Sequence, residues 1–132
     1  MPDNLMHVTI KSVTDADVQQ VDFLTDFGPG IGIWKGLYPT TGQSFDVEID
    51  IDAVLETGVN MVVVAAKNTP SMRTVADKAI IVGQLEQNED DGVAIIRMGN
   101  SVLMVEFKGE ALPLLSWVQI GPVRLSLSDT NS

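Results

Sequence analysis

Four carboxylates alternate with four apolar side chains between Phe45 and Asp52, a stretch that reads FDVEIDID. The acids of this row are Asp46, Glu48, Asp50 and Asp52. Residues two apart on a strand lie about 6.6–6.8 Å from one another on the same face. Such a row could hold a divalent cation, supply an acid–base pair or attract a basic partner. Because every exposed alternating strand gives this spacing, we interpret the row first as a solvated face and second as a candidate partner-binding surface, ahead of a metal or catalytic site.

The residue inventory excludes several kinds of catalytic and metal site. The chain has no cysteine and a single histidine, His7. Disulfides, thiolate metal sites and sites with several histidines are therefore excluded within one chain. No Gly-x-Ser-x-Gly nucleophile motif is present. We predict no catalytic residue, no metal site and no cofactor, and we favour a non-enzymatic role.

The net charge of −10 is unevenly distributed along the 132 residues. Residues 1–56 contain ten acids and two bases, whereas residues 57–132 contain eight acids and six bases. An acidic surface repels phosphate backbones, so we expect no nucleic-acid partner. A basic protein is the better electrostatic match. No segment approaches the ~20 apolar residues of a membrane span, so we expect a cytoplasmic protein without a membrane partner.

Three of the eight basic residues lie in one segment, and they are Lys67, Arg73 and Lys78. They could form a loop or lid over an acidic site. This segment belongs to an alternative function, in which carboxylates at a barrel mouth bind a small ligand or catalyse a reaction.

The clearest supersecondary pattern is a hairpin with strands at Val93–Met98 and Ser101–Lys108 around the Gly99-Asn100 turn. This register sets Ile96 opposite Leu103 and Ile95 opposite Met104. Both faces of the hairpin are then apolar, and only one of them can face the core. The other face needs a cover from another element or another protein. Its members are Val93, Ile95, Val102 and Met104.

The remaining elements are predicted from periodicity and turn residues. We expect strands at 6–13, 79–87 and 117–127, the last bent at Gly121-Pro122, and a buried strand at 59–66. We expect residues 33–38 to pair with 45–52 as a hairpin. Residues 53–58 favour one turn of helix, and Thr69-Pro70 favours the start of a second helix. Residues 14–27 fit helix or strand equally.

These elements predict a mainly-β fold in one domain, residues 1–132, with loose termini at 1–5 and 129–132. From Phe45 onward their order resembles an oligonucleotide/oligosaccharide-binding (OB) barrel, which implies a small antiparallel barrel with one or two short helices. A β-sandwich is the alternative fold. The predicted function is a protein-interaction module with an acidic surface and an apolar patch. An immunity-type inhibitor, a subunit of a larger assembly or a homo-oligomer would fit that prediction.

Overall fold

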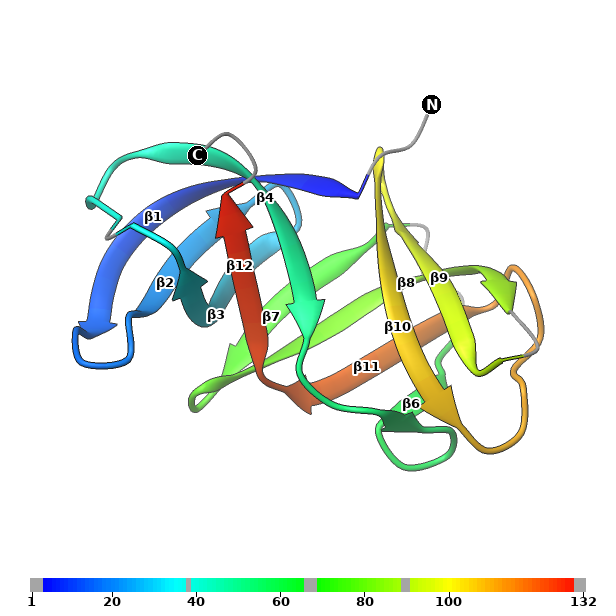
Figure 1. The fold of residues 1–132 in the computed structure, drawn as a ribbon. Coiled ribbons are helices and arrows are strands. Elements are labelled where there is room, and N and C mark those ends of the chain that lie inside the picture. The colour runs from blue at the N-terminus through cyan, green and yellow to red at the C-terminus, as the bar shows by residue number, and fades with distance from the viewer. Residues whose placement is uncertain (1–3, 38, 66–68, 89–90, 130–132) are drawn as a thin grey trace.

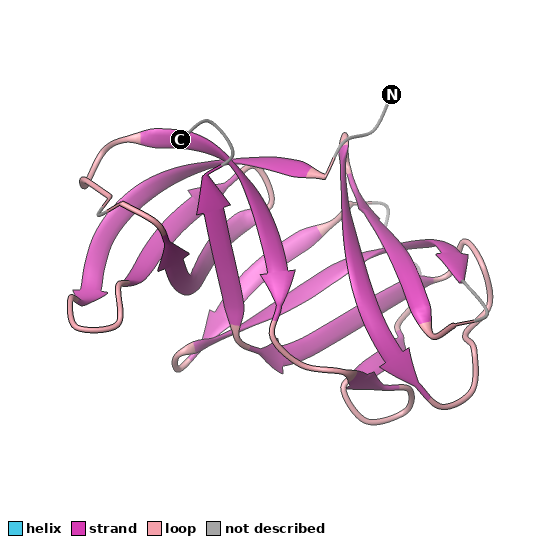
Figure 2. Ribbon diagram, in the orientation of Figure 1, coloured by secondary structure: helices cyan, strands magenta, loops and turns pink. Residues whose placement is uncertain are grey.

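The computed structural model describes residues 4–37, 39–65, 69–88 and 91–129, and within them the chain forms strands and no helix (Figure 2). The strands are β1 (Leu5–Asp15), β2 (Gln20–Thr25), β3 (Gly28–Lys35), β4 (Ser44–Ile51), β5 (Leu55–Glu56), β6 (Met61–Val63), β7 (Ser71–Val75), β8 (Lys78–Asn88), β9 (Val93–Met98), β10 (Ser101–Lys108), β11 (Trp117–Val123) and β12 (Leu125–Asp129). The mainly-β prediction is confirmed.

The two predicted helices are wrong. Residues 71–80 form β7, a tight turn and the start of β8, and residues 55–56 form the short strand β5. In β7 only Met72 is buried, while its neighbours Ser71 and Arg73 are exposed. This alternation lets β7 pair along the edge of β8, and the pairing outweighs the preference of Thr69-Pro70 for a helix start.

Five strands close into a barrel in the order β1-β2-β3-β12-β4, with β4 returning to β1 (Figure 1). The β3–β12 pair is parallel and the other pairs are antiparallel. The barrel prediction is confirmed, and five strands is the number in an OB barrel. The predicted location was wrong, because four of the five strands precede residue 52 and only β12 comes from the end of the chain.

The alternation of β4 sends Val47 and Ile49 into this barrel and leaves Asp46 and Asp50 exposed. The predicted hairpin between residues 33–38 and 45–52 is wrong. β12 lies between β3 and β4 and pairs with both. We expected β3 and β4 to pair directly, but β12, from the end of the sequence, pairs with one edge of each. Trp34 is still in the core, and its ring lies 4.7 Å from that of Phe45.

The other strands form a sheet in the order β5-β10-β9-β8-β11-β6, with β7 also paired to β8. A bridge between Thr57 and Met61 brings its two ends together, so the sheet is nearly closed. The β9–β10 hairpin has the predicted register, with Ile96 opposite Leu103 and Ile95 opposite Met104. The predicted buried strand at 59–66 is wrong. Of residues 59–65, only 61–63 form a strand, and Val59 is 69% exposed, while Ala66 lies outside the described residues.

The chain crosses between the barrel and the second sheet twice, from β4 to β5 and from β11 to β12. The predicted final strand is in fact two, because β11 belongs to the sheet and β12 to the barrel, with Arg124 between them. The expected irregularity near Gly121-Pro122 is a register shift between Ile120 and Val123. β7 also touches the barrel, since the Met72 amide donates to the Phe27 carbonyl at 2.9 Å. The buried side chains of both parts form one continuous core.

Candidate functional site

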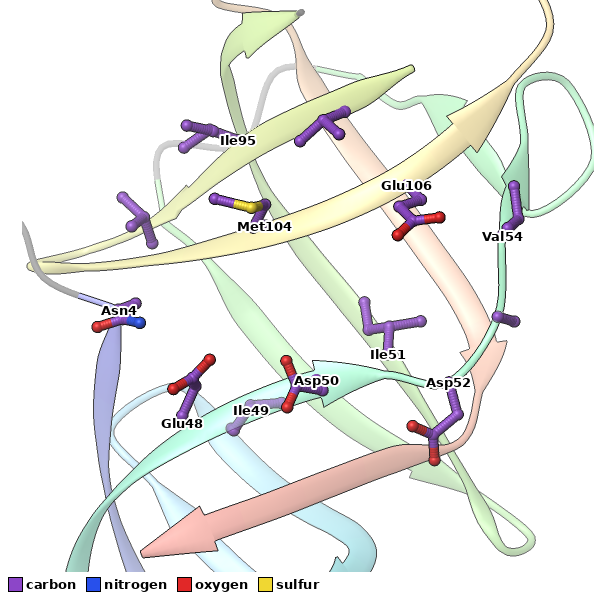
Figure 3. A pocket seen from close by; sticks show the side chains of 13 residues that line it. Asn4, Glu48, Ile49, Asp50, Ile51, Asp52, Val54, Ile95, Met104 and Glu106 are labelled. Atoms are coloured by element: carbon purple, nitrogen blue, oxygen red, sulfur yellow. The ribbon is translucent and has the colours of Figure 1, made fainter. Parts of the chain in front are cut away.

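A groove of about 520 Å³ lies between β4 of the barrel and the β9–β10 hairpin of the sheet (Figure 3). Asn4 marks one end of the groove and Val54 the other. At the first end, the Ser101 hydroxyl donates to the Leu5 carbonyl at 2.6 Å and ties the hairpin to β1. At the second end, residues 52–54 carry the chain from β4 to β5, which pairs with β10. The groove is thus framed by two strands that are joined at both ends.

One wall of the groove is acidic. Glu48 and Asp50 stand on the outer face of β4 because the alternating Val47 and Ile49 fill the barrel interior. Both carboxylates point toward the hairpin (Figure 3). Asp52 also lines the groove, and it accepts a hydrogen bond of 2.7 Å from the buried Ser126 hydroxyl. This bond fixes the end of β4 against β12.

The opposite wall is mainly apolar and belongs to the hairpin. Four of its side chains are the predicted uncovered face, Val93 and Ile95 from β9 with Val102 and Met104 from β10, and Glu106 of β10 is its one acid. Met104 is 67% exposed, whereas the other three apolar side chains are half-buried. This face thus meets an open groove instead of a further element of the fold.

The groove contains carboxylates without basic neighbours. Its lining has four acids, Glu48, Asp50, Asp52 and Glu106, and no lysine, arginine or histidine. The two bases on the hairpin are each paired with an acid outside the groove lining, Arg97 with Glu86 at 2.7 Å and Lys108 with Glu56 at 4.0 Å. Within the described residues, no ion pair reaches Glu48, Asp50 or Glu106. Unneutralised carboxylates beside apolar side chains create a strong preference for a cation that carries hydrocarbon.

The structure brings together seven of the eight residues predicted for partner binding. The exception is Asp46, which lies outside the groove and accepts a hydrogen bond from His7 at 3.1 Å when the Nδ1 atom carries a proton. The lid residues lie elsewhere. Arg73 is exposed on β7, Lys78 begins β8, and neither lines the groove. Lys67 lies outside the described residues.

Several lining residues of the groove were not among the predicted site residues, and they include Asn4, Ile51, Val54 and Glu106. A signal for Glu106 was present. It follows Val102 and Met104 at the same two-residue period, so it had to lie on the same face of β10. Asn4 and Val54 had no comparable signal, because they reach the groove only through the closure of the barrel and the pairing of β5.

No group of metal-ligating side chains and no membrane-spanning helix emerges from the parts of the chain that the structure describes. Their histidine, aspartate and glutamate side chains form no group of three or more suited to a metal ion. Nor do they contain a helix of the length and apolarity needed to cross a membrane. Comparison with protein-family models, curated proteins and solved structures finds no match to this chain.

Proposed function

We propose that this chain is a non-enzymatic protein-interaction module, and that the groove between β4 and the β9–β10 hairpin binds a basic, partly apolar partner. The observation that carries the proposal is that the groove combines four carboxylates with the apolar face of the hairpin and has no base in its lining. Apolar contacts supply affinity, while complementary charge supplies specificity and a fast association rate. An immunity-type inhibitor of a basic protein and a subunit of an assembly both match this chemistry.

The charge of the groove also bears on competing partners. A nucleic acid would bring phosphates toward four carboxylates, so we propose no nucleic-acid partner. A second copy of the chain would bring a surface from a protein of net charge −10. We therefore favour a different, basic protein over self-association. The cytoplasmic location stays part of the proposal and depends on the sequence alone.

Capture from native extract tests the proposal, with the groove variants Ile95→Glu and Asp50→Lys compared with the unmodified chain. Each has a matched control in the β1–β2 turn, where Val18 and Asp17 are exposed: Val18→Glu and Asp17→Lys. The captured protein is then purified and its affinity is measured directly. We expect each groove variant to bind at least about tenfold more weakly, as for a truncated interface anchor. A partner that the groove variants bind as tightly as the controls would refute the proposal.

A second candidate is supported by the size of the groove, because about 520 Å³ lies in the range of small-ligand sites. In this alternative the groove binds a small apolar amine, or the carboxylates catalyse a reaction on one. Thermal melts with phenethylamine and related amines distinguish the two candidates. A bound amine raises the midpoint in the unmodified chain and leaves it unchanged in Asp50→Lys. Midpoints that no amine moves remove this candidate.

A further inference from the structure

The edge of β10 that faces the groove has no strand partner over Val102–Met104. β10 pairs with β9 along its whole other edge, and it meets β5 only at Phe107 and Lys108. The Phe107 amide donates to the Gly92 carbonyl on the β9 side at 2.7 Å. Because backbone groups alternate between the two edges of a strand, the amides and carbonyls of Val102 and Met104 point away from β9. They are free backbone groups within the described part of the chain.

β4 lies on this side of β10 but does not pair with it. Its ladder partners within the described residues are β1 and β12 alone. The β1 ladder ends at Glu48, so from Ile49 to Ile51 the corresponding edge of β4 has no strand partner among residues 4–37, 39–65, 69–88 and 91–129. The groove therefore lies where two unpaired strand edges approach each other. Exposed edges of this kind accept extended chains, which pair through backbone hydrogen bonds.

The chemistry of the two walls specifies the side chains of an added strand. Side chains alternate between the two faces of a strand. The row on the groove face would lie between Val102 and Met104 on one side and Glu48 and Asp50 on the other. The other row would lie beside Leu103 and Val105, the buried face of β10. A basic row, whose hydrocarbon stems contact Val102 and Met104, and an apolar row on the opposite face satisfy both surroundings in one extended segment.

We propose that the occupant of the groove is an extended segment of a partner protein, alternating apolar and basic side chains, that adds as a strand to the free edge of β10 at Val102–Met104. The inference rests on the proposed function, because it names the form in which the partner enters. It differs from that function in requiring backbone hydrogen bonds to two named residues.

Synthetic peptides test the inference on the full chain. The probe is an eight-residue capped peptide that alternates valine and lysine. One comparison peptide has glutamate in place of lysine. Two others are N-methylated, one on its odd-numbered and the other on its even-numbered residues, so that each blocks the amides along one edge of the peptide strand. We expect the glutamate peptide to bind about a hundredfold more weakly, and one of the N-methylated peptides about tenfold more weakly, than the probe. Bound probe should also slow hydrogen exchange at the Val102 and Met104 amides.

A pair of protein variants isolates the backbone contribution. Met104→Pro removes the free amide without touching the β9 ladder, because that amide points away from β9. Met104→Ala removes the same side chain and keeps the amide. Circular dichroism confirms that both variants are folded. We expect Met104→Pro to bind the probe about tenfold more weakly than Met104→Ala.

The possible outcomes separate this inference from the proposed function. Equal affinity of the probe and both N-methylated peptides would overturn strand addition. If the probe does not bind while Ile95→Glu still loses the captured partner, the inference fails and the proposed function stands. If the probe binds and protects Val102 and Met104 while the groove variants keep the captured partner, the proposed function fails instead. A dimer that Ile95→Glu dissociates would make a second copy the occupant and overturn the inference.

Discussion

At the scale of single residues, the turn between β7 and β8 contains a backbone conformation that its residue type does not favour. Val75 pairs with Lys78, which leaves Ala76 and Asp77 as a two-residue hairpin turn. Ala76 has a φ of 56° and Asp77 does not have a positive φ. This is the pattern of a type II′ turn, whose first position favours glycine.

We therefore expect Ala76→Gly to stabilise the protein. The left-handed conformation costs a residue with a Cβ about 1–2 kcal/mol, and glycine avoids that cost. The greater freedom of glycine in the unfolded chain offsets about 0.4–1 kcal/mol of the gain. The free energy of unfolding, measured in urea, should rise by about 0.5–1 kcal/mol.

The control is Ala16→Gly. Ala16 is exposed in the turn after β1 and has no positive φ. Glycine there should lower the free energy of unfolding by about 0.4–1 kcal/mol through the unfolded state alone. If Ala76→Gly and Ala16→Gly change the free energy of unfolding in the same direction, the positive φ of Ala76 is not the cause of the effect.

At the scale of elements, the sequence predicted what is local and missed what is distant. The β9–β10 hairpin was predicted with its register, because its alternation and its turn lie within 16 consecutive residues. β12 was misassigned, because its two ladder partners are residues 33–35 and 47–51. A short run such as Leu125–Asp129 contains no information about which distant edges it joins.

The importance of β12 can be measured through Leu127. This side chain is fully buried, opposite Trp34 on β3 and Ile49 on β4. Leu127→Ala removes packing at the strand that closes the barrel, so we expect the free energy of unfolding to fall by about 2–5 kcal/mol. The matched control is Leu24→Ala on β2, since Leu24 is 41% exposed. If Leu24→Ala lowers the free energy of unfolding as much as Leu127→Ala does, the packing of β12 is not especially important for the stability of the barrel.

At the scale of the whole molecule, the candidate site arises from a juxtaposition that no local pattern encodes. The acidic row of β4 and the apolar face of the hairpin were each identified from two-residue alternation. Their meeting in one groove depends on the closure of the barrel by β12 and on the links at Leu5 and β5. The sequence therefore predicted most of the residues of the groove without predicting the groove itself.

The same interleaving of the chain leads to a prediction about cooperativity. The last barrel strand, β12, follows the entire second sheet in the sequence, so the barrel cannot close without residues from both ends of the chain. The contact between the two parts is tight. A Cβ added at Gly30 of the barrel would lie 2.4 Å from the Phe23 ring and 2.7 Å from the sulfur of Met72 on β7. We expect the barrel and the sheet to unfold together in one two-state transition.

The two tryptophans allow a direct measurement, because Trp34 lies in the barrel and Trp117 in the sheet. Trp117→Phe leaves the barrel reporter and Trp34→Phe leaves the sheet reporter. Within each variant, the urea midpoint from fluorescence should equal the midpoint from far-ultraviolet circular dichroism, which averages over both parts. Comparing probes within one variant removes any effect of the substitution on stability itself. Fluorescence and circular dichroism midpoints that separate in either variant would mean that one part unfolds before the other, and that the continuous core does not couple them.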